Sequence, residues 1–213
     1  MNYVVGIDEV GRGPLAGPVT VCLVCCEDRL YRKLKQNRSL PKLGQDSKKI
    51  SEKNRQKYSL TLKSLMSKTV FDISKGDPFG NEIGMWYVVN HVSNRVIDQK
   101  GISFAIEGAI ATGIKGLNLD AKNCIILLDG GLRVPKNFKQ KTIIKGDERE
   151  KIISWASILA KVSRDDLMIN LSRKYSFYGF DKHKGYGTKH HREMILEFGL
   201  SKIHRKTFCK KLI

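Results

Sequence analysis

The sequence lacks any apolar run close to the roughly 18 to 20 residues that a membrane-spanning helix needs, so we expect no membrane contact. It also lacks a basic segment ahead of the apolar residues at its N-terminus, which predicts a cytoplasmic protein without a signal peptide. No repeat, low-complexity tract or proline- or glycine-rich linker divides the 213 residues. This length suits one domain with one hydrophobic core.

Cysteine is scarce, and the five residues form an odd set, so the sequence is not that of a disulfide-stabilised scaffold. Two of them have the spacing of a zinc-binding pair. They lie, however, in an apolar run typical of a buried strand, and no second pair follows at the expected interval. We therefore expect buried thiols and no zinc site at Cys22, Cys25, Cys26, Cys124 and Cys209.

Acidic residues are few: 21 Asp and Glu stand against 39 Lys and Arg, which gives a net charge of +18. This excess of positive charge favours a polyanionic binding partner, and nucleic acid is the leading candidate. The alternative is that exposed lysines only keep the protein soluble. Nucleotide-binding motifs are missing as well. The sequence has no P-loop, and the glycines from Gly11 to Gly17 precede a predicted strand, where a dinucleotide-binding fingerprint needs a helix.

Apolar runs rich in β-branched residues predict strands, and apolar residues at helical spacing predict helices. Ser51 is the expected N-cap of one helix. The order of these elements indicates an α/β or α+β domain with a mixed sheet. The predicted strands are 3–8, 19–26, 69–73, 124–128 and 142–144, and the predicted helices are 51–67, 81–99, 104–114, 148–174 and 188–198.

Four acids stand where apolar neighbours make a charge costly. Asp8 and Glu9 end an apolar strand, Asp129 ends the most apolar strand, and Asp165 lies in a largely apolar helix. Carboxylates gathered in a cleft repel one another unless a cation compensates, and the motifs show no cationic partner. Oxygen ligands favour Mg²⁺ or Mn²⁺, and two such ions can hold the attacking water and the leaving oxygen of a phosphodiester. An acidic centre in a basic chain therefore indicates a nuclease.

A structural interpretation of each acid stays open. Neighbouring strand residues point to opposite faces, so Asp8 and Glu9 share a site only if the strand ends or bulges there. A strand-terminal Asp also commonly caps a turn. In the helix, a period of 100° per residue places Asp166 near the centre of the apolar stripe and Asp165 at its edge. Periodicity alone therefore predicts that Asp166 is buried.

Seven blocks of sequence carry a resemblance to a known family: 6–18, 46–51, 128–130, 145–147, 156–165, 185–188 and 204–208. In their order along nearly the whole chain they resemble type 2 ribonuclease H, the ribonuclease HII family. The resemblance implies an α/β fold, a ribonuclease H-like mixed β-sheet flanked by helices, with a C-terminal helical part. We expect residues 1–174 to form the catalytic core and residues 175–213 a basic helical extension of the same domain.

The resemblance assigns metal binding and catalysis to Asp8, Glu9, Asp129 and Asp165, with Mg²⁺ or Mn²⁺ as cofactor. The resemblance implies that Asp165 is the metal ligand rather than Asp166, the residue that the periodicity places at the centre of the apolar stripe. The implied reaction is hydrolysis of the RNA strand of RNA/DNA hybrids and incision 5′ of ribonucleotides embedded in duplex DNA, leaving 3′-hydroxyl and 5′-phosphate ends. We expect a monomer. The alternative is an inactive, basic nucleic-acid-binding protein with the same fold, which would have lost one or more of the four acids.

Substrate recognition is expected at three places. Glycine lets the main chain approach the minor groove, so we expect Gly11, Arg12 and Gly13 to sense the 2′-hydroxyl through backbone groups. The resemblance places Tyr186 on the sugar of the nucleotide that follows the ribose. Lys48 either contacts a phosphate or is simply exposed.

Three further positions carry weaker expectations. Trp155 stands where the family usually has a small residue, so local helix packing should differ. Asp147 is either a turn residue or a support for the metal ligands. The histidines of the basic tail, His183, His190 and His191, are expected to face solvent or phosphate.

Overall fold

The most apolar segments of the chain form the middle of one mixed sheet. We describe a computed structural model, which defines residues 2–36, 50–68 and 84–212. Within these residues the sheet has six strands in the order β3-β4-β2-β1-β5-β6. The strands are β1 (Tyr3–Val10), β2 (Val19–Glu27), β3 (Ser67–Lys68), β4 (Met85–Val92), β5 (Cys124–Asp129) and β6 (Lys139–Ile143).

Strand β1 lies between an antiparallel neighbour, β2, and a parallel neighbour, β5. It pairs with β2 in antiparallel register along its whole length and with β5 in parallel register only from Tyr3 to Ile7. Strand β2 pairs with β4 antiparallel, and β5 pairs with β6 parallel. The carboxyl ends of the parallel strands β1 and β5 therefore meet at one edge of the sheet, where the acids stand.

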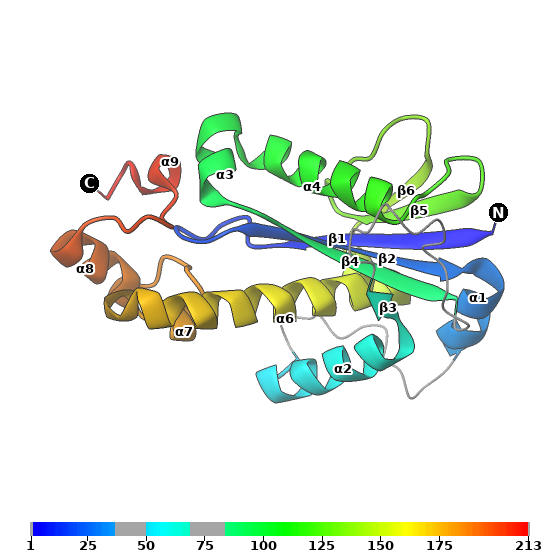
Figure 1. Cartoon of the computed structure of the whole chain (residues 1–213), viewed down its shortest axis with the longest axis horizontal. Helices are drawn as coiled ribbons and strands as arrows, with labels where there is room; N and C mark the ends of the chain where they lie inside the picture. Colours follow the sequence, from blue (N-terminus) through cyan, green and yellow to red (C-terminus); the bar gives the residue numbers. More distant parts are fainter. Residues whose placement is uncertain (1, 37–49, 69–83, 213) are drawn as a thin grey trace.

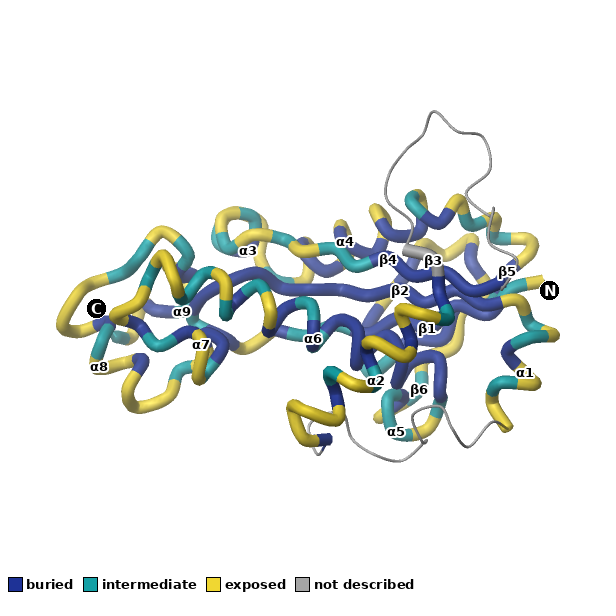
Figure 2. Tube along the Cα trace, turned by 60° about the horizontal axis from the view of Figure 1, so that its bottom comes forward, coloured by how far each residue is buried: buried dark blue, intermediate teal, exposed yellow. Residues whose placement is uncertain are grey.

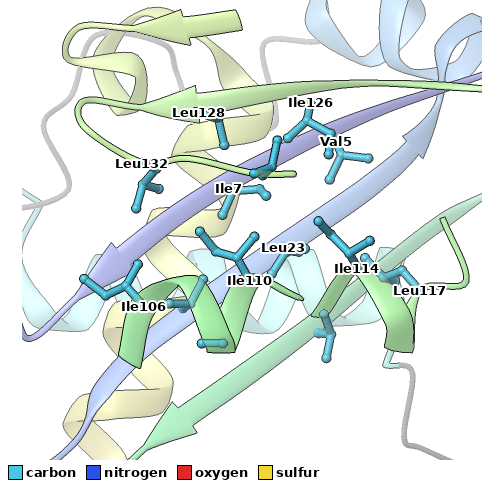
Figure 3. Close-up of a cluster of buried hydrophobic side chains, with 14 of the residues drawn as sticks. Val5, Ile7, Leu23, Ile106, Ile110, Ile114, Leu117, Ile126, Leu128 and Leu132 are labelled. Carbon is cyan, nitrogen blue, oxygen red and sulfur yellow. The ribbon is translucent and has the colours of Figure 1, made fainter. Parts of the chain in front are cut away.

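Helices cover both faces of the sheet (Figure 1). Helix α4 packs on one face, where its isoleucines meet alternate residues of β1, β2 and β5, as Figure 3 shows. The long helix α6 packs on the other face, with α2 beside it. The helices of these two layers are α1 (Asp28–Gln36), α2 (Glu52–Leu65), α3 (Asn94–Lys100), α4 (Ile102–Gly116), α5 (Gly146–Arg149) and α6 (Lys151–Lys174).

The C-terminal part forms one end of the molecule, far from the N-terminus (Figure 1). Its own buried cluster includes Ala16 and Met168, so residues of the Gly-rich loop and of α6 pack into it. An isolated bridge joins Ala16 to His204. The elements here are a 3-10 helix (Ser176–Tyr178), α7 (Phe180–His183), α8 (Lys189–Phe198) and α9 (Lys206–Cys209).

Most predicted elements are confirmed. Strands form at the start of the chain and at 124–128 and 142–143, and helices form within 104–114 and 188–198. Ser51 caps α2, because its side-chain oxygen accepts the Asn54 N–H at 3.3 Å. The predicted helix 148–174 is interrupted at Glu150, which accepts hydrogen bonds from Lys35 and Tyr31. The predicted strand 69–73 lies outside the described residues.

The predicted helix 81–99 is wrong over most of its described length. Met85–Val92 is a strand, and only Asn94–Lys100 is helical. Both faces of β4 are covered: Trp86 belongs to the cluster under α4 and Tyr87 to the cluster under α6. A strand buried on both faces loses the alternation of apolar and polar residues, so its pattern imitates a helix.

The cysteines and the helices can be compared with what composition predicts. All five cysteines are free and buried, so none joins a disulfide. None of the helices in residues 2–36, 50–68 and 84–212 combines the length and hydrophobicity that crossing a lipid bilayer requires.

Trp155 tests the packing under α6. Its side chain is fully buried and meets the Tyr31 ring edge-on, with centroids 6.0 Å apart. Trp155→Ala should lower the free energy of unfolding by about 3–5 kcal/mol, because the cavity would remain largely empty. Leu60→Ala on α2 is the matched control, since Leu60 is 67% exposed, and it should cost about 0.5 kcal/mol or less. Urea denaturation measures both. Equal costs for the two variants would contradict this account of the core.

Candidate active site

A cleft of about 690 Å³ opens at the edge where β1 and β5 end. It is lined from several directions: by the end of β1 and the glycine-rich loop after it, by α2, by β5, by α6 and by the segment before α8. All four predicted acids line it. The lining residues used below are Asp8, Glu9, Gly11, Arg12, Gly13, Arg55, Asp129, Asp147, Ser157, Lys161, Asp165, Lys182, Lys184 and Tyr186.

Asp8 is the most deeply set carboxylate, at 7% exposure. Burial raises its pKa well above the ordinary value, and the neighbouring charges of Glu9 and Asp129 raise it further. Hydrogen bonds from the Ser157 side chain and from the Glu9 N–H oppose this shift. The carboxylate is therefore held ionised only at a cost, which a cation in the cleft would relieve.

Asp8 and Glu9 share the cleft although they are strand neighbours. The pairing of β1 with β5 stops at Ile7, while β1 itself continues to Val10 beside β2. Within the described residues, the edge of β1 that pairs with β5 therefore has no strand partner at either acid. Glu9 pairs with Arg12 at 3.2 Å.

Asp129 and Asp165 reach the cleft from a strand and a helix. Asp129 ends β5, and its Oδ1 accepts the Gly146 N–H at 2.6 Å. Asp165 is buried at 5% exposure on α6 and pairs with Lys161 at 2.8 Å and with Arg55 at 3.7 Å. The carboxylates thus reach one space from β1, β5 and α6.

The periodicity argument for Asp166 is wrong. Asp166 is exposed and accepts a hydrogen bond from Gln56, whereas Asp165 is buried. Nearly every residue from the start of α6 to Ala160 is buried, because this helix packs on the sheet and is enclosed by α2 and the C-terminal part. A helix buried on most sides has no single apolar stripe from which to read an orientation.

The motifs alone show no cationic partner for the acids, whereas the structure supplies three. Arg12 pairs with Glu9, and Lys161 and Arg55 pair with Asp165. As the side chains stand, no three His, Cys, Asp or Glu residues in the described part of the chain are grouped closely enough to hold one ion. The donor chemistry nevertheless fits a divalent cation: four carboxylates line one cleft, and the buried Asp8 is destabilised by its acidic neighbours.

Apart from Arg12, sequence reasoning missed the cations of the cleft. Lys161 lies four residues before Asp165, a helical spacing that the sequence displays. Arg55 comes from α2, more than a hundred residues away, and no sequence signal joins it to Asp165. Lys182 and Lys184 also line the cleft, as does Asp147.

The predicted substrate-recognition residues divide into two groups. Gly11, Arg12, Gly13 and Tyr186 line the same cleft as the acids, and Tyr186 is 40% exposed. Its centroid lies 5.8 Å from the guanidinium carbon of Arg164. Lys48 lies outside the described residues.

The histidines of the tail differ from the expectation that they face solvent or phosphate. His190 is exposed, but His191 is fully buried and His183 stacks on it with centroids 4.4 Å apart. A sequence has no signal for this, because the apolar cluster around the ring is assembled from separate segments.

A chain of hydrogen bonds joins the buried histidines to the cleft. The Ser201 N–H donates to Nδ1 of His204 at 2.8 Å, so neutral His204 carries its proton on Nε2. That proton is donated to Nε2 of His191 at 3.0 Å. His191 then donates from Nδ1 to the Tyr186 carbonyl at 2.9 Å. Burial lowers the pKa of both imidazoles to about 4, which keeps this chain neutral near pH 7.

Comparison with solved structures agrees with the fold. Ribonuclease H2 from Pyrococcus horikoshii is similar in structure, with a TM-score of 0.73 at 22% identity, covering 99% of this chain and 96% of that one. Bst-RNase HIII in complex with Mn²⁺ has a TM-score of 0.66 at 14% identity, covering 99% and 68%. The class that the architecture defines is therefore that of proteins with the ribonuclease H-like fold.

Sequence comparison gives the family. The ribonuclease HII family model matches residues 5–211. The ribonuclease HII of Endomicrobium trichonymphae is 39% identical over 206 residues, 96% of this chain and 84% of that protein. The ribonuclease HII of Caldicellulosiruptor saccharolyticus is 36% identical over 212 residues, with coverage of 100% and 89%. The chain belongs to the ribonuclease HII family and is an endoribonuclease, a hydrolase with ribonuclease H activity.

The buried histidines make stability depend on pH. A folded-state pKa of about 4, below the ordinary 6.5, means that the unfolded chain binds protons first as pH falls. Stability is therefore complete above pH 6.5 and is lost as pH falls towards 4. On lowering pH from 7 to 5, each imidazole should remove about 2 kcal/mol from the free energy of unfolding.

The effect is best measured as a difference between variants, because the raised pKa of Asp8 acts in the opposite direction. Urea denaturation at pH 7 and pH 5 should show a smaller loss for His204→Gln than for the unmodified chain. His190→Gln changes an exposed ring and should behave like the unmodified chain. The same loss in all three proteins would contradict the assignment.

Proposed function

We propose that this endonuclease hydrolyses the RNA strand of RNA/DNA hybrids and incises 5′ of ribonucleotides embedded in duplex DNA, leaving 3′-hydroxyl and 5′-phosphate ends. The observation that carries the proposal is one cleft that holds four carboxylates beside the glycine-rich loop, in a chain of net charge +18. Positive charge attracts the nucleic acid backbone, and the acidic cleft concentrates cations at the scissile phosphate.

Divalent cations, Mg²⁺ or Mn²⁺, fit this donor set. Asp8, Glu9, Asp129 and Asp165 would hold them, and when bound they would supply Lewis-acid activation of the water and stabilisation of the leaving oxygen. The Mn²⁺ complex of the structurally similar Bst-RNase HIII supports the choice of metal. Asp165 already has Lys161 at 2.8 Å, so this ammonium group holds the carboxylate in place and competes with a metal for it.

The chain's own residues would orient the substrate. Lys182 lines the cleft at an exposed position and would offer positive charge to phosphates, whereas Lys184 is buried and its ammonium group donates to the Asp181 carbonyl. The backbone of Gly11, Arg12 and Gly13 would approach the ribose and sense its 2′-hydroxyl, the group that distinguishes RNA from DNA. Tyr186, half exposed at the same cleft, would stack on the next sugar.

We further propose that Lys48 contacts a phosphate. We propose a monomer in which residues 1–174 form the catalytic core and 175–213 an extension of the same domain. The shared buried cluster supports the second point, because Ala16 and Met168 of the core pack with Phe180 and Ile195 of the extension.

The direct test is incubation with a labelled duplex that contains one ribonucleotide. We expect a single cut on the 5′ side of the ribonucleotide with Mg²⁺ or Mn²⁺, an uncut all-DNA duplex, and no cut in excess chelator. End analysis should find a 3′-hydroxyl and a 5′-phosphate. Full cleavage in chelator would overturn the metal-dependent mechanism, and equal cutting of both duplexes would overturn the proposed substrate.

Asp165 and Asp166 form a matched pair on α6. Asp165→Asn should abolish hydrolysis, a loss of at least about a thousandfold, while leaving hybrid binding intact, because it removes a carboxylate from the cleft. Asp166→Asn removes the same charge from an exposed neighbouring position and should retain measurable activity. Single-turnover cleavage and a gel-shift assay read the two properties. The reverse pattern would show that the catalytic acid is assigned one residue too early.

Gly13 offers a clean substitution in the recognition loop. A Cβ at Gly13 would meet nothing within 4 Å, so Gly13→Ala should fold normally. If the backbone at this position touches the ribose, the added methyl should cut the preference for a ribonucleotide-containing duplex over all-DNA by about tenfold or more. Gly11 is unsuitable, because its φ is +88° and a Cβ would lie 2.3 Å from Nε of Arg164. An unchanged preference in folded Gly13→Ala would exclude contact at this residue.

A further inference from the structure

Two arginines of the ribonuclease HII chain are fully buried at the back of the glycine-rich loop. Arg164 lies on α6, next to Asp165, and Arg205 lies just before α9. Within the described residues, neither guanidinium reaches ion-pair distance of a carboxylate. A buried cation without an acidic partner needs other oxygen atoms around it.

Backbone carbonyls take that place. Arg205 donates to the carbonyls of Gly11 at 2.7 Å, Arg12 at 2.9 Å and Gly17 at 2.9 Å. Its own N–H donates to the Leu15 carbonyl at 2.7 Å. One residue, 194 positions along the chain from Gly11, thereby fixes four carbonyls of the loop.

Arg164 completes the arrangement from the other side. It donates to the carbonyls of Pro18 at 2.9 Å, Ala16 at 3.3 Å and Lys184 at 3.0 Å. The carbonyls of this loop are therefore turned into the protein, towards two positive charges. Burial lowers the pKa of the Arg205 guanidinium to about 9, which reflects how completely it is removed from water.

The direction of the carbonyls sets the direction of the amides. The peptide bonds here are trans, so each C=O and the N–H that follows it point in opposite directions. With the carbonyls of Gly11 and Arg12 drawn towards Arg205, the N–H groups of Arg12 and Gly13 point away from it. Neither N–H donates to an acceptor within residues 2–36, 50–68 and 84–212. Both residues line the cleft that holds the acids.

We propose that Arg205 is a positioning residue for ribonucleotide recognition: its guanidinium holds the glycine-rich loop so that the Arg12 and Gly13 amides are free to meet the 2′-hydroxyl. The inference rests on the function proposed above and assigns the specificity for ribose partly to a residue that touches no substrate. A guanidinium is suited to this task, because its donors are fixed in one plane and can reach several carbonyls at once.

The neighbouring residue ties the second recognition element to the same point. His204 acts through His191 on the carbonyl of Tyr186. Residues 204 and 205 therefore hold the loop and the tyrosine in one fixed relation. The C-terminal part thus sets the geometry of both places where the ribonucleotide is expected to be read.

The test is Arg205→Lys, which keeps the charge but replaces the planar fork by a single ammonium group. Dissociation constants are measured in excess chelator for a duplex with one ribonucleotide and for the same duplex in all-DNA form. The unmodified chain should bind the ribonucleotide duplex more tightly. In the variant the ratio of the two constants should fall about tenfold, towards one, with all-DNA binding changed less than about twofold.

Lys206→Ala is the matched control, because it removes an exposed charge from the next position and should leave the ratio unchanged. A purely structural role for Arg205 predicts a lower melting temperature and an equal loss for both duplexes, and that result would overturn the proposal. An unchanged ratio in folded Arg205→Lys would also overturn it.

Two further outcomes are decisive. If Arg205→Lys fails to fold, Arg205→Gln is measured in the same way, since an amide keeps two planar donors. If neither variant folds, Arg205 is required for folding and a separate positioning role is wrong. A ratio of one in the unmodified chain overturns the proposed ribose recognition itself, a failure distinct from a preference that survives in the variant.

Discussion

Repulsion among carboxylates in a partly buried cleft is the constraint on which the rest of this structure depends. Asp8 carries it most strongly, because burial and two acidic neighbours all raise its pKa. Hydrogen bonds and ion pairs stabilise three of the carboxylates. Asp8 accepts hydrogen bonds from the Ser157 side chain and from a backbone N–H. Glu9 forms an ion pair with Arg12, and Asp165 forms ion pairs with Lys161 and Arg55. Each of these contacts offsets part of the repulsion that the carboxylates exert on one another.

The sheet is what makes this gathering of acids stable. Strands β1 and β5 are parallel and covered by helices on both faces, so their apolar residues anchor the two backbones firmly behind the cleft (Figure 3). The pairing of β1 with β5 ends at Ile7, directly before the two consecutive acids Asp8 and Glu9. In Figure 2 the buried trace runs along the centre of the molecule into the C-terminal part.

The sequence predicted structure correctly wherever that structure is determined by residues close together in the chain. Strand ends, the Ser51 cap and the buried cysteines follow from neighbouring residues alone, and the motif blocks led to the family. It failed where burial comes from several directions at once. Strand β4 and helix α6 are enclosed on most sides, so hydrophobic periodicity misread 81–99 as a helix and Asp166 as a buried residue. The ion pair of Arg55 with Asp165 could not be predicted, because the two residues are distant in sequence.

The basic tail shows why composition alone misjudges function. Counting charges treats every Lys and Arg as surface available to nucleic acid, yet Arg205 is fully buried, and so is the imidazole of His191. Their donors are used on backbone carbonyls of the loop and of Tyr186. In the proposed function, positive charge therefore works at two depths: exposed lysines would attract the backbone of the substrate, and the buried Arg205 would fix the peptide groups that face it. The role of the buried arginine depends on the direction in which its N–H donors point and not on the amount of charge. A net charge of +18 therefore cannot reveal it.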